Sequence, residues 1–168
     1  MIPSSGSSIV VSLKAGIAIG SNLGDRAAAV ARAFAFLARL SPGHCLCSPV
    51  YETAPVDCPP GSGGFLNAAA EIDFAGSPGE LLARLHEHER SEGRGREGGE
   101  KERNAPRAID LDILYFGDRT IDEAGLVIPH PRMKGRRFVM EPLAAIVPGL
   151  IFPGETRTVG EILGDLKD

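Results

Sequence analysis

Two aspartates separated by one residue, Asp110 and Asp112, are the clearest candidates for chemistry in this sequence. Ile109, Leu111, Ile113 and Tyr115 alternate with Asp110, Asp112 and Leu114, which predicts a β-strand. A period of two then places both carboxylates on one face of the strand, roughly 6 to 7 Å apart. Hard oxygen ligands at that spacing suit Mg²⁺, which keeps several waters and takes further ligands from substrate phosphates. An isolated Asp-x-Asp is more often a solvated strand face, so its surroundings must decide.

Basic residues flank the predicted strand on both sides. They are Arg90, Arg94, Arg96, Lys101, Arg103 and Arg107 before it, and Arg132, Lys134, Arg136 and Arg137 after it. Arginine binds phosphate oxygens through two parallel hydrogen bonds and stays charged at physiological pH. Glutamates in the first group could instead balance it as a solvated loop, and we assign Lys101 and Arg90 to that role. An acidic pair between arginine groups favours a metal and triphosphate site.

Several other side chains could bind a substrate. His130 can donate to a phosphate, and Phe65 and Phe138 can stack on a flat heterocycle while Asn67 bonds to its polar edge. Each of these residues, taken alone, is more often structural. The run at 20–25 lacks the Gly-Lys-Ser/Thr ending of a nucleotide-binding loop, and we interpret it as a tight turn between a strand and a helix.

An α+β fold must position these residues. The hydrophobic pattern predicts strands over 9–19, 45–51, 65–74 and 109–115, helices over 27–40 and 78–91, and loops over 53–64 and 92–106. Asp25 is an expected helix cap, and the run at 77–80 and the pair Thr158 and Glu161 are expected capping boxes. The order β-α-β-β-α-β predicts a ferredoxin-like antiparallel sheet with helices packed on it, followed by short C-terminal helical pieces.

Composition narrows the class of protein. With 168 residues, 43% of them hydrophobic, and a net charge of -4, the chain is expected to be a single domain over 9–168 behind a flexible extension at 1–8. A pI near 5.6 argues against a dedicated nucleic-acid binder. We expect no membrane span and no signal peptide. Three cysteines make no disulfide framework, which favours the cytoplasm, and the spacing of Cys45 and Cys47 does not fit a zinc site.

The ordered motifs resemble those of the hydroxymethyl-dihydropterin pyrophosphokinases. The matching segments are 18–24, 51–55, 65–69 and 105–114, extended by 129–130 and 133–136, so the resemblance covers roughly residues 16–153. It implies transfer of pyrophosphate from ATP to the hydroxymethyl group of 6-hydroxymethyl-7,8-dihydropterin, with AMP as the second product, in folate biosynthesis. It also implies two Mg²⁺ ions and a monomer that binds these small molecules.

The resemblance also implies roles for individual residues. Asp110 and Asp112 would bind the two metal ions and act in catalysis together with Arg94, Arg96 and Arg107. The implied ATP contacts are Glu89, Arg94, Arg107, Ile113, Leu126, Val127, His130 and Arg136. The implied pterin contacts are Thr53, Ala54, Pro55, Val56, Phe65, Asn67 and Phe138.

The sequence departs from the family pattern at three places, one of which is the N-terminal extension, which has no counterpart in the family. The segment from Arg96 to Arg107 is longer than in well-known members, and it lacks a tryptophan often found there, because the chain has none. Pro131 stands where a tyrosine is common. These departures leave the closure of the 92–106 loop and one phosphate contact open.

Two other functions compete with this interpretation. A two-metal nucleotidyltransferase also combines a Gly-Ser turn with Asp-x-Asp, but within about a dozen residues, whereas the two motifs here lie about ninety apart. An RNA-binding module can share a ferredoxin-like fold. It would need basic and aromatic residues where the predicted strand carries Asp110 and Asp112, which would repel phosphate without a metal.

Overall fold

The computed structural model describes residues 11–54, 63–93 and 108–167. The extension expected at residues 1–8 lies outside the described residues. The same is true of some predicted site residues, namely Pro55, Val56, Arg94, Arg96 and Arg107.

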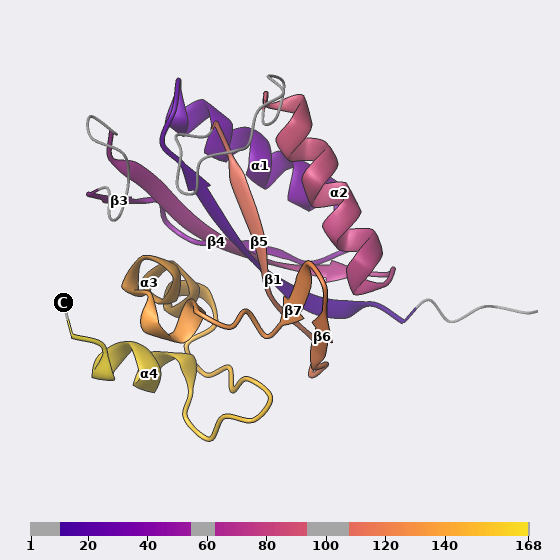
Figure 1. The fold of residues 1–168 in the computed structure, drawn as a ribbon, viewed down its shortest axis with the longest axis vertical. Helices are drawn as coiled ribbons and strands as arrows, with labels where there is room; N and C mark the ends of the chain where they lie inside the picture. Colours follow the sequence, from indigo (N-terminus) through magenta and orange to yellow (C-terminus); the bar gives the residue numbers. More distant parts are fainter. Residues whose placement is uncertain (1–10, 55–62, 94–107, 168) are drawn as a thin grey trace, which may run out of the picture.

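An antiparallel sheet forms the centre of the fold (Figure 1). Its long strands are β1 (Leu13–Ser21), β4 (Phe65–Phe74) and β5 (Asp110–Phe116), and its short strands are β2 (Cys45–Cys47) and β3 (Tyr51–Thr53). The strand order is β2-β4-β1-β5, and β3 also pairs with β4. β1 is therefore a central strand, antiparallel to both β4 and β5.

Helices cover both faces of this sheet. α1 (Arg26–Leu40) and α2 (Pro78–Ser91) pack on one face, α3 (Arg137–Ile146) packs on the other, and α4 (Val159–Asp165) packs against α3 (Figure 1). The predicted combination of helices with an antiparallel sheet is confirmed. No helix in the described ranges has the length and apolar character needed to cross a membrane.

Polar side chains fix where three of the helices begin. The Asp25 carboxylate accepts a hydrogen bond from a backbone N–H in the first turn of α1, and the Ser77 hydroxyl accepts one from the N–H of Glu80 in α2, both at 3.1 Å. Thr158 and Glu161 form a reciprocal capping box at α4, with bonds of 3.1 and 2.8 Å. The cap predicted at Asp25 and the capping box predicted at Thr158 and Glu161 are confirmed, and at 77–80 the structure shows the Ser77 bond of the predicted capping box.

Two hydrophobic cores lie on opposite faces of the sheet. Ile17 and Ile19 of β1 are 0% and 2% exposed in the core beneath α1 and α2. Leu114 of β5 and Met140 of α3 belong to the second core, together with Phe152. Because helices cover both faces, a cavity over either face requires a gap in the packing of a helix against the strands.

β5 departs from strict alternation near its end. Ile113 pairs with Ile17, but Tyr115 pairs with Gly16, so Leu114 is an extra residue and the strand bulges. Tyr115 therefore faces the α3 side together with Leu114. The prediction that Tyr115 shares a face with Ile113 is wrong. The bulge arises from the pairing of β5 with β1, and the alternation of apolar and polar residues along β5 does not reveal it.

The bulge sends the Tyr115 ring across Gly16 toward β4. A Cβ atom on Gly16 would overlap this ring. The Tyr115 hydroxyl donates to the carboxylate of Glu71, which is 4% exposed and also contacts His44 Nε2 at 3.0 Å. Burial and the bond to Glu71 raise the pKa of Tyr115, so its hydroxyl remains a donor.

The strand predicted over 45–51 is two strands, β2 and β3, with an interruption at 48–50. Pro49 has no N–H to donate to a ladder. Ser48 keeps the chain on the sheet, since its N–H donates to the carbonyl of Ala69 at 2.9 Å and its hydroxyl accepts from the N–H of Ala69 at 2.8 Å.

A hairpin after β5 was not anticipated. It consists of β6 (Ile121–Glu123) and β7 (Leu126–Ile128), which pair with each other apart from the main sheet. Gly125 in its turn has a φ of +81°, a conformation that favours glycine. The three-residue strands are too short to produce a recognisable alternation.

We expect Gly16→Ala to destabilise the fold by about 3 kcal/mol, because the new methyl group must displace the Tyr115 ring from its bond to Glu71. Urea unfolding followed by circular dichroism measures this loss. Gly149→Ala is the matched control, since its added Cβ meets no atom within 4 Å. Equal stability of the two variants would contradict the packing described here.

Candidate functional site

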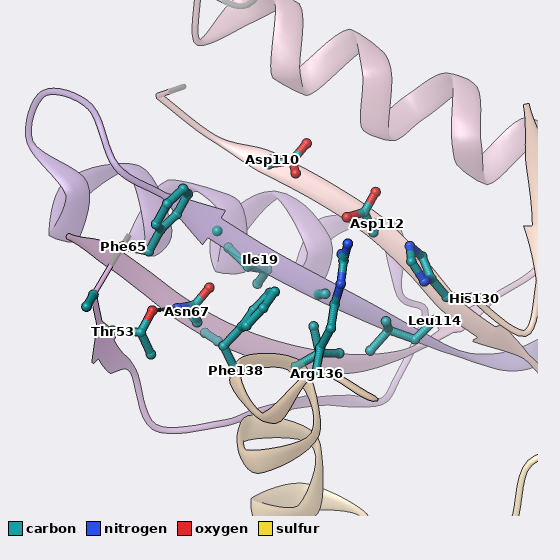
Figure 2. Close-up of a pocket in the computed structure, with 15 residues that line it drawn as sticks. Ile19, Thr53, Phe65, Asn67, Asp110, Asp112, Leu114, His130, Arg136 and Phe138 are labelled. Atoms are coloured by element: carbon teal, nitrogen blue, oxygen red, sulfur yellow. Dashed lines mark hydrogen bonds between the residues drawn. The ribbon is translucent and has the colours of Figure 1, made fainter. Parts of the chain in front are cut away.

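The acidic pair lies on the α3 side of β5 (Figure 2). Asp110 pairs with Gly20 of β1 and Asp112 pairs with Ala18. Leu111 between them is 2% exposed and belongs to the core on the opposite face. The prediction that both carboxylates share one face of a strand is confirmed.

Gly20 lies between a predicted amide contact and a predicted metal ligand. It pairs with Asn67 on β4 and with Asp110 on β5, so the three residues form a row across the sheet. Neighbouring strands are about 4.8 Å apart, which places Asn67 and Asp110 roughly 10 Å from each other. Because Gly20 has no side chain, the space above the middle of this row is open.

A cavity of about 220 Å³ lies over the row, and we name it the aromatic cavity. Phe65 of β4 and Phe138 of α3 line it, and Thr53 of β3 lines it beside Asn67 (Figure 2). Phe138 is 37% exposed, which is unusual for a large aromatic side chain that serves only to fill a core. The lining combines two aromatic rings with a few polar groups, as ligand pockets do.

Thr53 and Asn67 present a defined hydrogen-bonding pattern to the aromatic cavity. The Asn67 amide nitrogen donates to the Thr53 hydroxyl oxygen at 2.7 Å, and Asn67 is 6% exposed. The Asn67 amide oxygen lies on the Gly20 side, 3.7 Å from where a Cβ of Gly20 would be. This oxygen can accept from a ligand N–H, while the Thr53 hydroxyl can donate its own proton.

His130 is held with one ring nitrogen as a donor. Its backbone N–H donates to the carbonyl of Leu114 at 2.9 Å, which ties it to β5. Its Nδ1 accepts from the N–H of Arg132 at 3.2 Å, so Nε2 carries the proton in the neutral ring. Burial lowers the pKa of His130, and the positive charges of Arg136 and Arg132 lower it further.

The N-terminus of α3 opens onto the aromatic cavity. Arg136 occupies the cap position without a capping side-chain bond, and Arg136, Phe138 and Val139 all line the cavity. The Arg136 guanidinium carbon lies 5.6 Å from the centroid of the Phe138 ring, a cation–π distance. An uncapped helix N-terminus and an arginine together favour an anion at this wall.

A second cavity of about 270 Å³, here the hairpin cavity, adjoins the first. The predicted ATP contacts that line it are Glu89 of α2, Ile113 of β5, and Leu126 and Val127 of β7. Asp112 and His130 line both cavities. The two cavities therefore meet at these two side chains.

Each predicted site residue that the structure describes lines one of the two cavities or both. Arg136, predicted to contact ATP, lines the aromatic cavity and not the hairpin cavity. Sequence reasoning missed lining residues in both cavities, namely Ala18, Ile19, Gly20, Ala68, Leu114 and Val139 in the first, and Leu82, His86, Leu111, Gly125 and Pro131 in the second.

A signal for one missed residue was present. Gly20 belongs to the motif at 20–25 that was interpreted as a turn, but β1 continues through Ser21 and the bend begins after it. The matching motif at 18–24 could have suggested a role for Gly20. The other missed residues are mostly apolar, and their types do not separate cavity lining from core.

Comparison with known proteins identifies the family. The family model described as 7,8-dihydro-6-hydroxymethylpterin-pyrophosphokinase (HPPK) matches residues 16–148. A Bacillus subtilis protein named 2-amino-4-hydroxy-6-hydroxymethyldihydropteridine pyrophosphokinase is 42% identical over 131 residues, which are 77% of this chain and 75% of that protein. A Methylorubrum extorquens protein of the same name is 38% identical over 147 residues, covering 85% of this chain and 88% of the relative.

A solved structure shares the fold. The crystal structure of Plasmodium falciparum HPPK-DHPS wild type matches with a TM-score of 0.68 at 14% identity, over 92% of this chain. The match covers 44% of that longer chain, so this chain spans less than half of it. On the family model and the identity to its members, the chain belongs to the 7,8-dihydro-6-hydroxymethylpterin-pyrophosphokinase family.

Proposed function

We propose that the chain transfers pyrophosphate from ATP to the hydroxymethyl group of 6-hydroxymethyl-7,8-dihydropterin, giving AMP and the pterin diphosphate, a step of folate biosynthesis. Family membership supports this reaction. The structural observation that carries the proposal is that the aromatic cavity and the hairpin cavity meet at Asp112 and His130. Two substrates bound one in each cavity would present their reacting ends to the same side chains.

The pterin occupies the aromatic cavity in this proposal. Its flat ring system would stack against Phe65 and Phe138, since aromatic rings favour stacked or edge contacts. The Asn67 amide oxygen would accept from a ring N–H, and the Thr53 hydroxyl would donate to a ring acceptor. Ala54 supports this assignment as a further lining residue, and Pro55 and Val56 stay predicted contacts.

ATP occupies the hairpin cavity in this proposal, with its base near Ile113, Leu126 and Val127 and with Glu89 beside it. Its phosphates would extend past Asp112 and His130 toward Arg136 and the N-terminus of α3. The Nε2 proton of His130 and the guanidinium of Arg136 are donors suited to phosphate oxygens. Arg94, Arg96 and Arg107 stay predicted to hold the triphosphate.

Asp110 and Asp112 would hold the two Mg²⁺ ions. Two carboxylates on one strand face, both lining the aromatic cavity, fit a metal that takes few protein ligands and completes its shell with water and phosphate. Bound Mg²⁺ would neutralise phosphate charge and lower the pKa of the pterin hydroxyl.

The residues of the chain contribute mainly positioning and charge. The pterin hydroxyl oxygen attacks the β-phosphorus of ATP, the bond from that phosphorus to the α,β-bridging oxygen breaks, and AMP leaves with this oxygen. The hydroxyl proton passes to solvent or a nearby base. His130, Arg136 and the α3 N-terminus would stabilise the charge that moves onto the phosphate oxygens, and no nucleophilic side chain is needed.

We also infer that the strand order β2-β4-β1-β5 is a variant of the ferredoxin-like arrangement. α1 and α2 both connect strands of this sheet and pack on one of its faces, which supports the inference. The short strand β3 and the layer formed by α3 and α4 are additions to that plan.

We expect AMP to form from Mg-ATP only when 6-hydroxymethyl-7,8-dihydropterin is present, and Asp110→Asn and Asp112→Asn each to lower the rate at least about a hundredfold, because each removes a charge that holds the metal. Chromatographic separation of AMP and ATP measures the rate. Asp118→Asn is the control, since Asp118 is exposed and lines neither cavity. AMP formation without pterin, or full activity of both acidic-pair variants, would refute the proposal.

We expect Asn67→Ala to raise the KM for the pterin by roughly ten- to a hundredfold, since it removes a buried hydrogen-bonding group. The dissociation constant for ATP, measured by calorimetry without pterin, should stay within about twofold of the original value. Val127→Ala is the reciprocal variant and should weaken ATP by a few-fold through lost apolar contact. If Asn67→Ala weakens ATP as much as pterin, the assignment of the two cavities is wrong.

A further inference from the structure

The Ser21 side chain connects the end of β1 to the segment that leads into the acidic pair. Ser21 is 1% exposed, and its hydroxyl donates to the carbonyl of Ala108 at 2.5 Å. Ala108 lies two residues before Asp110, and the main-chain pairing of β1 with β5 ends at Gly20 and Asp110. The Ser21 hydroxyl thus extends the contact between the two strands beyond the last backbone pair.

Asp110 and Asp112 are held differently by the sheet. Asp112 lies inside β5, with paired residues on both sides of it, whereas Asp110 is the first residue of the strand. On its N-terminal side, Asp110 is held by the burial of Ile109, which is 0% exposed, and by the bond from Ser21 to Ala108. A strand end frays more readily than its middle. The position of Asp110 therefore depends more than that of Asp112 on the burial of Ile109 and on the hydrogen bond from Ser21 to Ala108.

A Mg²⁺ ligand tolerates little displacement. Mg²⁺ requires near-ideal octahedral geometry with ligand distances of about 2.0 to 2.1 Å, and a functional group must be held to within about 0.5 Å of its working position. We propose that Ser21 is a positioning residue for the metal site: its hydroxyl fixes the start of β5 so that the Asp110 carboxylate stays in register with Asp112. This assigns a role to Ser21 of the motif at 20–25, and it rests on the proposed function.

Ser21→Ala tests the proposal, with Ser48→Ala as the matched control. Ser48 is also a buried serine, 5% exposed. Its hydroxyl accepts from the N–H of Ala69 at 2.8 Å and donates to the carbonyl of Pro49 at 2.7 Å, and neither Ser48 nor Ala69 lines either cavity. Removing the Ser21 hydroxyl deletes one side-chain bond to the main chain, and removing the Ser48 hydroxyl deletes two, so the control loses at least as much main-chain support. A purely structural role for Ser21 predicts the same kind of loss in both variants.

The primary measurement is Mn²⁺ binding, followed by electron paramagnetic resonance in the presence of a non-hydrolysable ATP analogue. We expect Ser21→Ala to weaken Mn²⁺ binding roughly tenfold, the effect of one lost buried hydrogen bond, while Ser48→Ala stays within about twofold of the original chain. In kinetic assays, the Mg²⁺ concentration for half-maximal rate should rise in Ser21→Ala, and the KM for pterin should change less than about twofold. Ser21→Thr, which keeps the hydroxyl, should restore metal binding.

Thermal unfolding of each variant shows whether it is folded. If Ser21→Ala does not fold, Ser21→Cys replaces it, because a thiol keeps the side chain but is a weak donor, and the same loss of Mn²⁺ binding is expected. Unchanged Mn²⁺ affinity in a folded Ser21 variant, or an equal loss in Ser48→Ala, would overturn the proposal. Failure of the unaltered chain to form pterin-dependent AMP would count against the proposed function, whereas the comparison of the two serines tests the positioning role.

Discussion

The pairing of β1 with both β4 and β5 is the constraint on which the candidate site depends. Asn67 and Asp110 belong to segments far apart in the sequence. They lie in one row across the sheet, on either side of Gly20, because both pair with Gly20. A shift of one residue in either pairing would turn Asn67 or Asp110 toward the core beneath α1 and α2. The apolar side chains that alternate with them, such as Ala68 in β4 and Leu111 in β5, prevent such a shift because they must remain buried.

Charge is distributed unevenly around the meeting point of the two cavities. The carboxylates of Asp110 and Asp112 lie on β5, while Arg136 and the N-terminus of α3 lie on the opposing layer. Between them lies His130, whose pKa is lowered by burial and by the positive charges of Arg136 and Arg132. An acidic strand facing a basic helix end suits a ligand that brings both phosphates and metal cations, since neither wall alone would neutralise it.

Features of the fold and of the candidate site could be predicted where residues nearby in the sequence determine them. They could not be predicted where pairing between distant segments determines them. The shared face of Asp110 and Asp112 followed from the period of a strand, and the caps at Asp25 and Thr158 followed from residue type. The reversal of Tyr115 did not, because the bulge arises from pairing with Gly16. The residues of the hairpin cavity were suggested only by the family resemblance. Leu126 and Val127 line this cavity from β7, and the three-residue strands of that hairpin are too short to be predicted from the sequence pattern.

Gly16 and Gly20 lie on the same face of β1, yet their surroundings differ. The chain covers Gly16 with the ring of its own Tyr115, whereas Gly20 forms part of the floor of the aromatic cavity. The Tyr115 ring over Gly16 is thus an internal example of how a flat ring rests on the bare backbone of this strand. A side chain at position 16 would displace the Tyr115 ring, whereas a side chain at position 20 would take up space in the aromatic cavity. Two identical residues in one strand therefore serve unrelated physical needs, one the close packing of an internal ring and the other an open cavity floor.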